Sequence, residues 1–140
     1  MTPDTSTAPD LEGPGAEPPP PACVMCFNAS DPSGAGGLAG DIATVAAMGA
    51  HALPVVTAIV MRDTADIFDQ HEIEADAVAE QARTILEDVT LSGWKVGFLG
   101  NADNVSAVAE ILSDYSEIPL VSYMPNLSWL DEELQQPYMD

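Results

Sequence analysis

Short β-branched runs alternate with longer runs of helical period from Cys23 onward, and this alternation constrains the fold most. The predicted strands are "CVMCFNA", "LPVVTAIV", "WKVGFL" and "IPLVS". Between them, apolar spacing predicts a helix ending near Gly49, a second over residues 75–89 and a third that "NADN" caps. A polar segment leads from the second strand to the second helix. The pattern predicts an α/β fold, a parallel sheet with right-handed crossovers and helices on both faces.

The first helix is placed by apolar residues at helical spacing. They are Leu38, Ile42, Val45, Ala46 and Met48. Their spacing predicts an apolar stripe along one side of the helix.

Composition changes sharply near residue 22. Residues 1–21 are rich in proline and acidic residues and contain no aromatic side chain. Such a segment buries too little apolar surface to offset the entropy of ordering, so we predict a disordered tail over residues 1–21. Residues 22–140 have the length of one domain.

The charge balance excludes two classes of partner. Three basic residues face 23 acidic ones, for a net charge of -20. Nucleic acids and anionic membranes are not expected partners, because both require clustered Lys and Arg. The sequence has neither a long apolar run nor a signal-peptide pattern, so we predict a cytoplasmic protein.

Cys23 and Cys26 form a C-x-x-C pattern inside the first predicted strand. No second pair of Cys or His follows at the spacing of zinc ligands. We therefore interpret both as buried strand thiols and predict no metal site.

The stretch "SDPSGAGGLAGD", residues 30–41, connects the first strand to the first helix. Glycine allows positive φ and close approach of a ligand to the backbone, so the turn is a candidate binding site. It has no lysine, which excludes a Walker A loop. Gly34, Gly36 and Ala39 fit a dinucleotide fingerprint, although the nearest acid after the second strand, Asp63, comes late for ribose binding.

Two aspartates flank this turn. Asp31 either caps and ties the turn or takes part in binding. Asp41 falls in the first turns of the helix, where a carboxylate facing the glycines can accept a hydrogen bond from a ligand hydroxyl or amino group.

The chain resembles the hydroxymethylpyrimidine and phosphomethylpyrimidine kinases, which belong to the ribokinase-like superfamily. The resemblance rests on Ser-Asp-Pro-Ser-Gly from Ser30, a second aspartate ten residues after Asp31, and Lys-x-Gly-x-Leu-Gly from Lys95. It implies a three-layer Rossmann-like fold and phosphoryl transfer from ATP, with Mg²⁺, to an aminopyrimidine alcohol or its monophosphate. The small-molecule aminopyrimidine is the implied partner, and a homo-oligomer is the implied assembly.

Position by position, the resemblance implies that Asp41 and Gly36 contact the pyrimidine and that Asp31, Gly34 and Gly37 shape the turn. Three further positions match substrate-binding residues but are altered in this chain. Ala29 stands where the family often has glycine, Arg62 where it has a ring-recognising glutamine, and Phe98 where it has methionine. Tyr123 lies near an expected aspartate.

Arg62 has two interpretations. Its position after the second strand suggests that it favours a phosphorylated pyrimidine. Alternatively, it forms a surface ion pair with Asp63 or Asp66.

Members of the family are about twice as long, and the resemblance assigns the nucleotide site and the catalytic base to the second half. We therefore expect residues 22–140 to be the N-terminal part of a ribokinase-like kinase domain that is incomplete at its C-terminus, with no catalytic residue in this chain and no activity alone. The alternatives are a non-catalytic small-molecule-binding domain of the same fold and a dinucleotide-binding domain.

Overall fold

A computed structural model describes residues 19–123 of the chain. Strands and helices alternate along most of this range, as the periodicity predicts. The elements in chain order are β1 (Cys23–Ser30), α1 (Gly37–Ala47), β2 (His51–Arg62), β3 (Ile67–Glu72), α2 (Ala75–Leu86), β4 (Gly93–Val96), α3 (Ala102–Asp114) and β5 (Leu120–Ser122).

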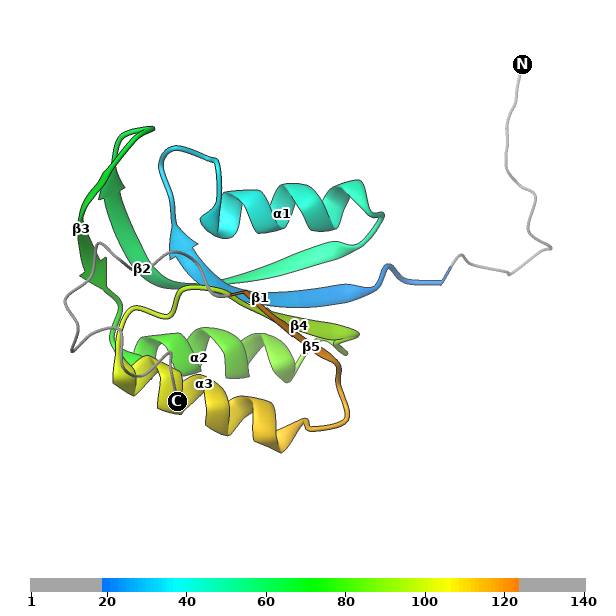
Figure 1. Cartoon of the computed structure of the whole chain (residues 1–140). Helices are drawn as coiled ribbons and strands as arrows, with labels where there is room; N and C mark the ends of the chain where they lie inside the picture. The colour runs from blue at the N-terminus through cyan, green and yellow to red at the C-terminus, as the bar shows by residue number, and fades with distance from the viewer. Residues whose placement is uncertain (1–18, 124–140) are drawn as a thin grey trace, which may run out of the picture.

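The sheet has five strands in the order β3-β2-β1-β4-β5. The β1–β2, β1–β4 and β4–β5 pairs are parallel, while β2 and β3 are antiparallel. Helix α1 covers one face of the sheet, and α2 and α3 lie side by side on the other (Figure 1). The predicted α/β architecture with helices on both faces is confirmed, but the sheet is mixed and not wholly parallel, because β3 pairs antiparallel with β2.

Most of the core lies between the sheet and the α2–α3 layer. Met25, Phe27 and Trp94 are fully buried or nearly so, and Phe27 stacks on Trp94 with ring centroids 6.0 Å apart. Val78, Val108 and Ile111 from the two helices complete this cluster. The core thus fixes one face of the sheet, while the opposite face, under α1, carries a smaller apolar cluster of Ala29, Ala58, Val60 and Phe98 next to polar groups.

The prediction missed strand β3 and treated its residues as a connection. The strand lies at the edge of the sheet and is largely exposed, so it carries little apolar alternation. Asp63 Oδ1 accepts hydrogen bonds from the backbone N–H groups of Ala65 and Asp66, 2.8 Å away in each case, and thereby builds the β2–β3 turn. These bonds also hold the pKa of the Asp63 carboxyl below its ordinary value.

Helix α1 is present where predicted, but its apolar stripe is not buried. Ile42 is 42% exposed and Met48 is 81% exposed, whereas Leu38 and Val45 are half-buried together with Asp41. The side toward the sheet therefore runs through Leu38, Asp41 and Val45. Polar contacts of Asp41, described below, orient the helix in this way.

The predicted tail falls mainly on residues 1–18, outside the described residues. Residues 19–22 precede β1 and are exposed. The predicted domain also extends past the described part at residues 124–140. Within residues 19–123, no helix is long and apolar enough to cross a membrane.

Candidate functional site

A cavity of about 430 Å³ lies between α1 and the carboxyl-terminal ends of β1, β2 and β4. Parallel α/β sheets bind ligands at this edge. The residues predicted to bind substrate all line it, and so do two of the predicted turn residues; the lining includes Ala29, Asp31, Gly36, Gly37, Asp41, Arg62, Lys95, Phe98 and Tyr123. Gly34 belongs to the same turn and is not part of this lining.

The glycine turn is tied together by Asp31. Its backbone carbonyl accepts a hydrogen bond from the Gly34 N–H at 3.0 Å. Its Oδ1 accepts hydrogen bonds from the Ser33 N–H and Oγ–H at 2.9 and 2.7 Å. These hydrogen bonds tie the turn together, and contact of Asp31 with a ligand stays a prediction.

Gly37 is the position in this turn that requires glycine most. Its φ is +64°, and an added Cβ would lie 2.5 Å from the Ala29 carbonyl oxygen and 2.8 Å from Asp31 Cβ. The close packing brings the start of α1 against the end of β1, which places the helix over the cavity.

Arg62 reaches the turn from the end of β2. Its Nη1 lies 3.4 Å from Asp31 Oδ2, and its Nε donates to the Asp63 carbonyl at 2.9 Å. Partial burial alone would raise the pKa of the Asp31 carboxyl, but the hydrogen bonds from Ser33 and the charge of Arg62 outweigh it and lower the pKa. The alternative ion pair with Asp63 or Asp66 is thus corrected, since the carboxylate that Arg62 contacts is that of Asp31.

Asp41 is held between two donors from the sheet. Lys95 Nζ lies 2.7 Å from Asp41 Oδ1, and Asn28 Nδ2 donates to Asp41 Oδ2 at 3.0 Å. The Asp41 side chain is 11% exposed and that of Lys95 is 24% exposed. Asp41 thus accepts one charge-assisted hydrogen bond from Lys95 and one hydrogen bond from the Asn28 amide.

Asn28 links Asp41 to the opposite wall of the cavity. Its Oδ1 accepts hydrogen bonds from the Phe98 N–H at 3.1 Å and the Ala29 N–H at 2.8 Å. The amide occupies space that only glycine leaves open, because a Cβ on Gly97 would lie 2.5 Å from Asn28 Nδ2.

Asn28, Lys95 and Gly97 were not among the predicted site residues. A signal was present, because Asn28 and Lys95 are polar residues inside two strands that are otherwise mostly apolar. Their contact with Asp41 depends on the parallel β1–β4 pairing, in which Phe27 lies opposite Val96. Strand order is not visible in local periodicity.

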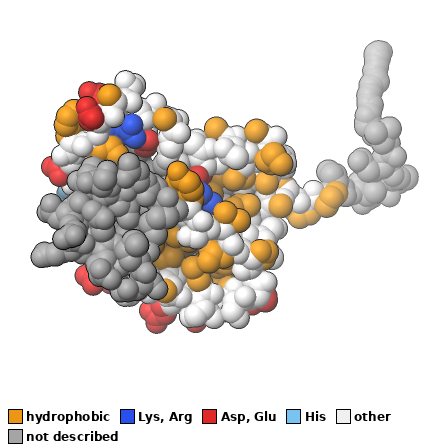
Figure 2. Space-filling model, viewed as in Figure 1, with side chains coloured by type: hydrophobic (Ala, Val, Ile, Leu, Met, Phe, Trp, Pro, Cys, Tyr) orange, Lys and Arg blue, Asp and Glu red, His pale blue; other side chains and the backbone are white. Residues whose placement is uncertain are grey.

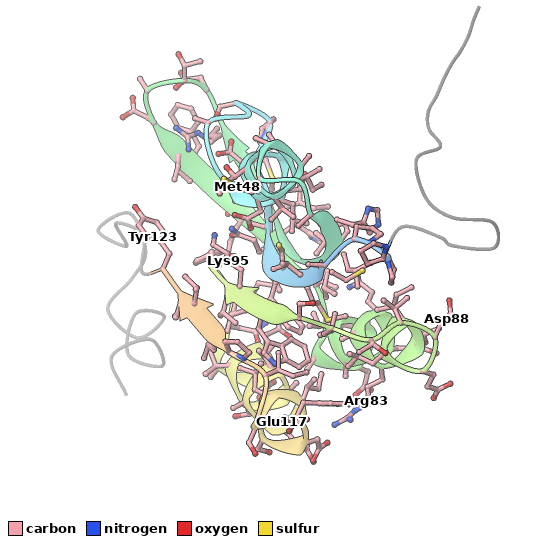
Figure 3. All side chains as sticks on the ribbon, turned by 90° about the vertical axis from the view of Figure 1, so that its right-hand side faces the viewer. Met48, Arg83, Asp88, Lys95, Glu117 and Tyr123 are labelled. Carbon is pink, nitrogen blue, oxygen red and sulfur yellow. The ribbon has the colours of Figure 1, made fainter. Side chains whose placement is uncertain are left out.

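One wall of the cavity is apolar. Ala29, Val60 and Phe98 are buried there, and Ile67 of β3 packs against them. Tyr123 lies on another side, with Lys95 Nζ 5.8 Å from its ring centroid (Figure 3). The cavity therefore combines an apolar surface with two ion pairs, which suits a flat, polar ring.

Cys26 lies on β1 near Asp41. Burial and the Asp41 charge, opposed by Lys95, raise the pKa of the Cys26 thiol to about 11. Cys26 is buried and Cys23 half-buried, and neither forms a disulfide. The interpretation of a buried strand thiol holds for Cys26, whose raised pKa gives a neutral, unreactive thiol, and is corrected for Cys23, which lies at the start of β1 and is only half-buried.

Positive charge is scarce on the face of the molecule that Figure 2 shows. The third basic residue, Arg83, pairs with Asp114 at 2.8 Å on the α2–α3 layer. Figure 3 places Arg83 on the far side of the sheet from Lys95. Two of the three cations of the chain thus line the cavity.

These features define a class of protein: an α/β fold with a cavity at the carboxyl-terminal edge of its sheet. The sequence profile of the phosphomethylpyrimidine kinase family matches residues 31–123. The chain belongs to this family, and its architecture is ribokinase-like.

Individual relatives agree with this assignment. The hydroxymethylpyrimidine/phosphomethylpyrimidine kinase of Escherichia coli (strain K12) is 40% identical over 92 residues, which cover 66% of this chain and 35% of that protein. The thiamine biosynthesis multifunctional protein ThiED of Corynebacterium glutamicum is 31% identical over 124 residues, covering 86% of this chain and 16% of that protein. The chain therefore spans only part of the relatives that it matches.

Solved structures show the same fold. The phosphomethylpyrimidine kinase of Clostridium difficile 630 superimposes with a TM-score of 0.73 at 24% identity, covering 84% of this chain and 53% of that chain. The Staphylococcus aureus pyridoxal kinase in complex with pyridoxal gives a TM-score of 0.60 at 23% identity, covering 66% of this chain and 34% of that chain. The dinucleotide alternative receives no support from these relatives, and Asp63 builds a turn instead of offering a ribose contact.

Proposed function

We propose that the cavity binds 4-amino-5-hydroxymethyl-2-methylpyrimidine or its monophosphate, as part of an ATP-dependent kinase of thiamine biosynthesis. The observation that carries this proposal is Asp41, a hydrogen-bond acceptor oriented by Lys95 and Asn28 opposite an apolar wall. An aminopyrimidine offers a donating amino group to the carboxylate and a flat face to Phe98. Family membership supplies the reaction class.

The roles of ATP and Mg²⁺ belong to the same proposal. Solved Staphylococcus aureus pyridoxal kinases contain ADP or AMP-PCP, which supports ATP as the phosphoryl donor. In the described part of the chain, no cluster of three or more His, Cys, Asp or Glu could hold a metal ion. Mg²⁺ enters the proposal as the ion that accompanies ATP, since it is usually held by substrate phosphates with only one or two carboxylates.

The role of these residues is to bind and orient the pyrimidine. Phosphoryl transfer depends on positioning the attacking oxygen and stabilising charge around the phosphoryl group. Asp41 and the glycine turn would hold the pyrimidine ring in one orientation. The hydroxymethyl oxygen, which attacks the phosphoryl group, would then also have a fixed position. A cytoplasmic location and a homo-oligomeric state are also proposed, by analogy with a bacterial biosynthetic family.

Replacing Asp41 by asparagine tests the binding role. We expect Asp41→Asn to weaken binding of the aminopyrimidine alcohol by about 1–3 kcal/mol, because a charge-assisted hydrogen bond contributes on that scale. Isothermal titration calorimetry on the 140-residue chain measures the change. Asp114→Asn is the matched control, since it removes a carboxylate from the exposed Arg83 pair. Unchanged affinity in Asp41→Asn would contradict the role of Asp41.

Arg62 provides a second test, on substrate preference. Its two contacts use only two of the five N–H donors of a guanidinium group. We propose that the others bind the phosphate of the monophosphate. Arg62→Gln should then lower the monophosphate-to-alcohol affinity ratio by about tenfold, or ~1.5 kcal/mol, the scale of a charged hydrogen bond.

Calorimetry with both ligands measures this ratio. Arg83→Gln makes the same chemical change on the α2–α3 layer and should leave the ratio unchanged. If the affinity ratio is the same in the unaltered chain, Arg62→Gln and Arg83→Gln, Arg62 does not bind the phosphate. Its role would then be the contact with Asp31 in the turn.

A further inference from the structure

We propose that Asn28 is a positioning residue that sets the hydrogen-bonding character of the cavity. The proposal rests on the proposed function, because it concerns how Asp41 meets an aminopyrimidine. Asn28 donates to Asp41 with one end of its amide and accepts from the Phe98 N–H with the other. One buried side chain thus connects the polar and the apolar walls.

The direction of these bonds determines what Asp41 can recognise. Lys95 and Asn28 each donate to a different oxygen of Asp41. A carboxylate oxygen has more than one acceptor position, so each retains capacity for a further donor. A ligand group that contacts Asp41 directly must therefore be an N–H or O–H donor.

The Asn28 side chain has little room to move. It is 7% exposed, and its amide fills the space beside Gly97, where a Cβ would come within 2.5 Å. The two residues form one unit, because the missing side chain of Gly97 makes room for the amide. Displacing the amide from either side should release Asp41 and Phe98 together.

Aspartate at position 28 gives a sharp test, because a carboxyl group has almost the shape of an amide. When protonated, it offers one donor and one acceptor, which reproduces the wild-type pattern toward Asp41 and Phe98. When ionised, it has no donor and places a second negative charge beside Asp41. Two adjacent carboxylates raise one pKa of the pair.

Other groups near Asp41 bear on this titration. Lys95 on β4 favours ionisation, Cys26 on β1 is neutral, and Tyr123 lies over Lys95. Arg62 and Asp31 pair with each other on the same cavity. Asn28→Asp therefore adds one titratable carboxyl group beside Asp41. The other charged residues around the cavity stay the same in the variant.

The experiment measures affinity for the aminopyrimidine alcohol from about pH 5 to about pH 8, in the unaltered chain and in Asn28→Asp. Dividing the two affinities at each pH removes the titration of the ligand itself. We expect Asn28→Asp to bind about tenfold more weakly at the alkaline end and to recover to within about threefold at the acid end. Asn101→Asp is the matched control, because it also places a new carboxylate beside an acidic residue, Glu72, at the N-cap of α3 and outside the cavity lining.

A double-mutant cycle tests the link to Gly97. Gly97→Ala should weaken binding in the unaltered background, because it displaces the amide. It should have little further effect in Asn28→Ala, where the space is already free.

The outcomes separate the two proposals. If the unaltered chain binds the aminopyrimidine and Asn28→Asp is either unaffected or weakened equally at every pH, the positioning role is overturned and the proposed function stands. Additive effects of Gly97→Ala and Asn28→Ala also overturn it. If the unaltered chain binds neither the alcohol nor the monophosphate, the proposed function fails and the role of Asn28 fails with it.

Discussion

Replacing Asn104 by aspartate is expected to destabilise the fold more than any other single change discussed above. Asn104 is fully buried, and its Nδ2 group lies 2.8 Å from the Leu99 carbonyl, 3.0 Å from that of Ile73 and 3.4 Å from that of Thr57. These carbonyls belong to β2 and to the segments that precede α2 and α3. A single amide therefore joins strand β2 to the two segments that precede α2 and α3.

An aspartate at this position would turn acceptor atoms toward acceptor carbonyls. We expect the free energy of unfolding to fall by about 3 kcal/mol or more, because each buried polar group left without a partner costs about 1–3 kcal/mol. Burial would raise the pKa of the introduced carboxyl above its unfolded value of about 3.9. The folded state then favours the protonated form, so the variant should lose further stability as the pH rises through the raised pKa.

Urea unfolding followed by circular dichroism, near pH 5 and near pH 8, measures both effects. Asn101→Asp is the control on the same helix: it keeps the N-cap but loses the exposed 2.7 Å bond from Asn101 Nδ2 to Glu72 Oε1, so it reports the smaller effect of a new carboxylate at the surface. A loss below about 1 kcal/mol in Asn104→Asp, or one that does not grow with pH, would contradict the role assigned to this amide.

The second large effect is expected at Gly37. Gly37→Ala combines a left-handed backbone, unfavourable for alanine by about 1–2 kcal/mol, with a Cβ placed 2.5 Å from the Ala29 carbonyl oxygen. The turn has to move, so we expect a total loss of about 2 kcal/mol or more and loss of aminopyrimidine binding.

Gly34→Ala is a matched control in the same turn. Gly34 has a similar φ of +73°, but an added Cβ meets nothing within 4 Å. Only the backbone penalty of about 1–2 kcal/mol applies, and binding should persist. Thermal melts and calorimetry compare the two variants, and equal effects on binding would show that close packing at Gly37 does not shape the site.

The layered fold could be predicted from sequence because its signals are local. Apolar periodicity located the helices, and Asn101 caps α3 through a 2.8 Å bond from the Asn104 N–H. Strand β3 could not be predicted in this way, because an exposed edge strand has no apolar pattern. Its best signal was the turn that Asp63 builds.

The candidate site could be predicted in part for a related reason. Residues at or just past the carboxyl ends of parallel strands meet at one edge of the sheet, which is why Ala29, Arg62 and Phe98 line one cavity with Gly36 and Asp41. The orientation of α1 was missed, because it depends on Asp41 bonding to Lys95 and Asn28. Those contacts join residues far apart in sequence and arise only once β1 pairs with β4.

The central claim is that the cavity under α1 binds an aminopyrimidine. A titration of the ¹⁵N-labelled 140-residue chain with 4-amino-5-hydroxymethyl-2-methylpyrimidine, followed by amide chemical shifts, tests it most directly. The account predicts saturable shifts concentrated at Gly36, Gly37, Asp41 and Phe98, with little change at Arg83 on the opposite layer. No shifts at saturating ligand, or shifts confined to the α2–α3 layer, would contradict it.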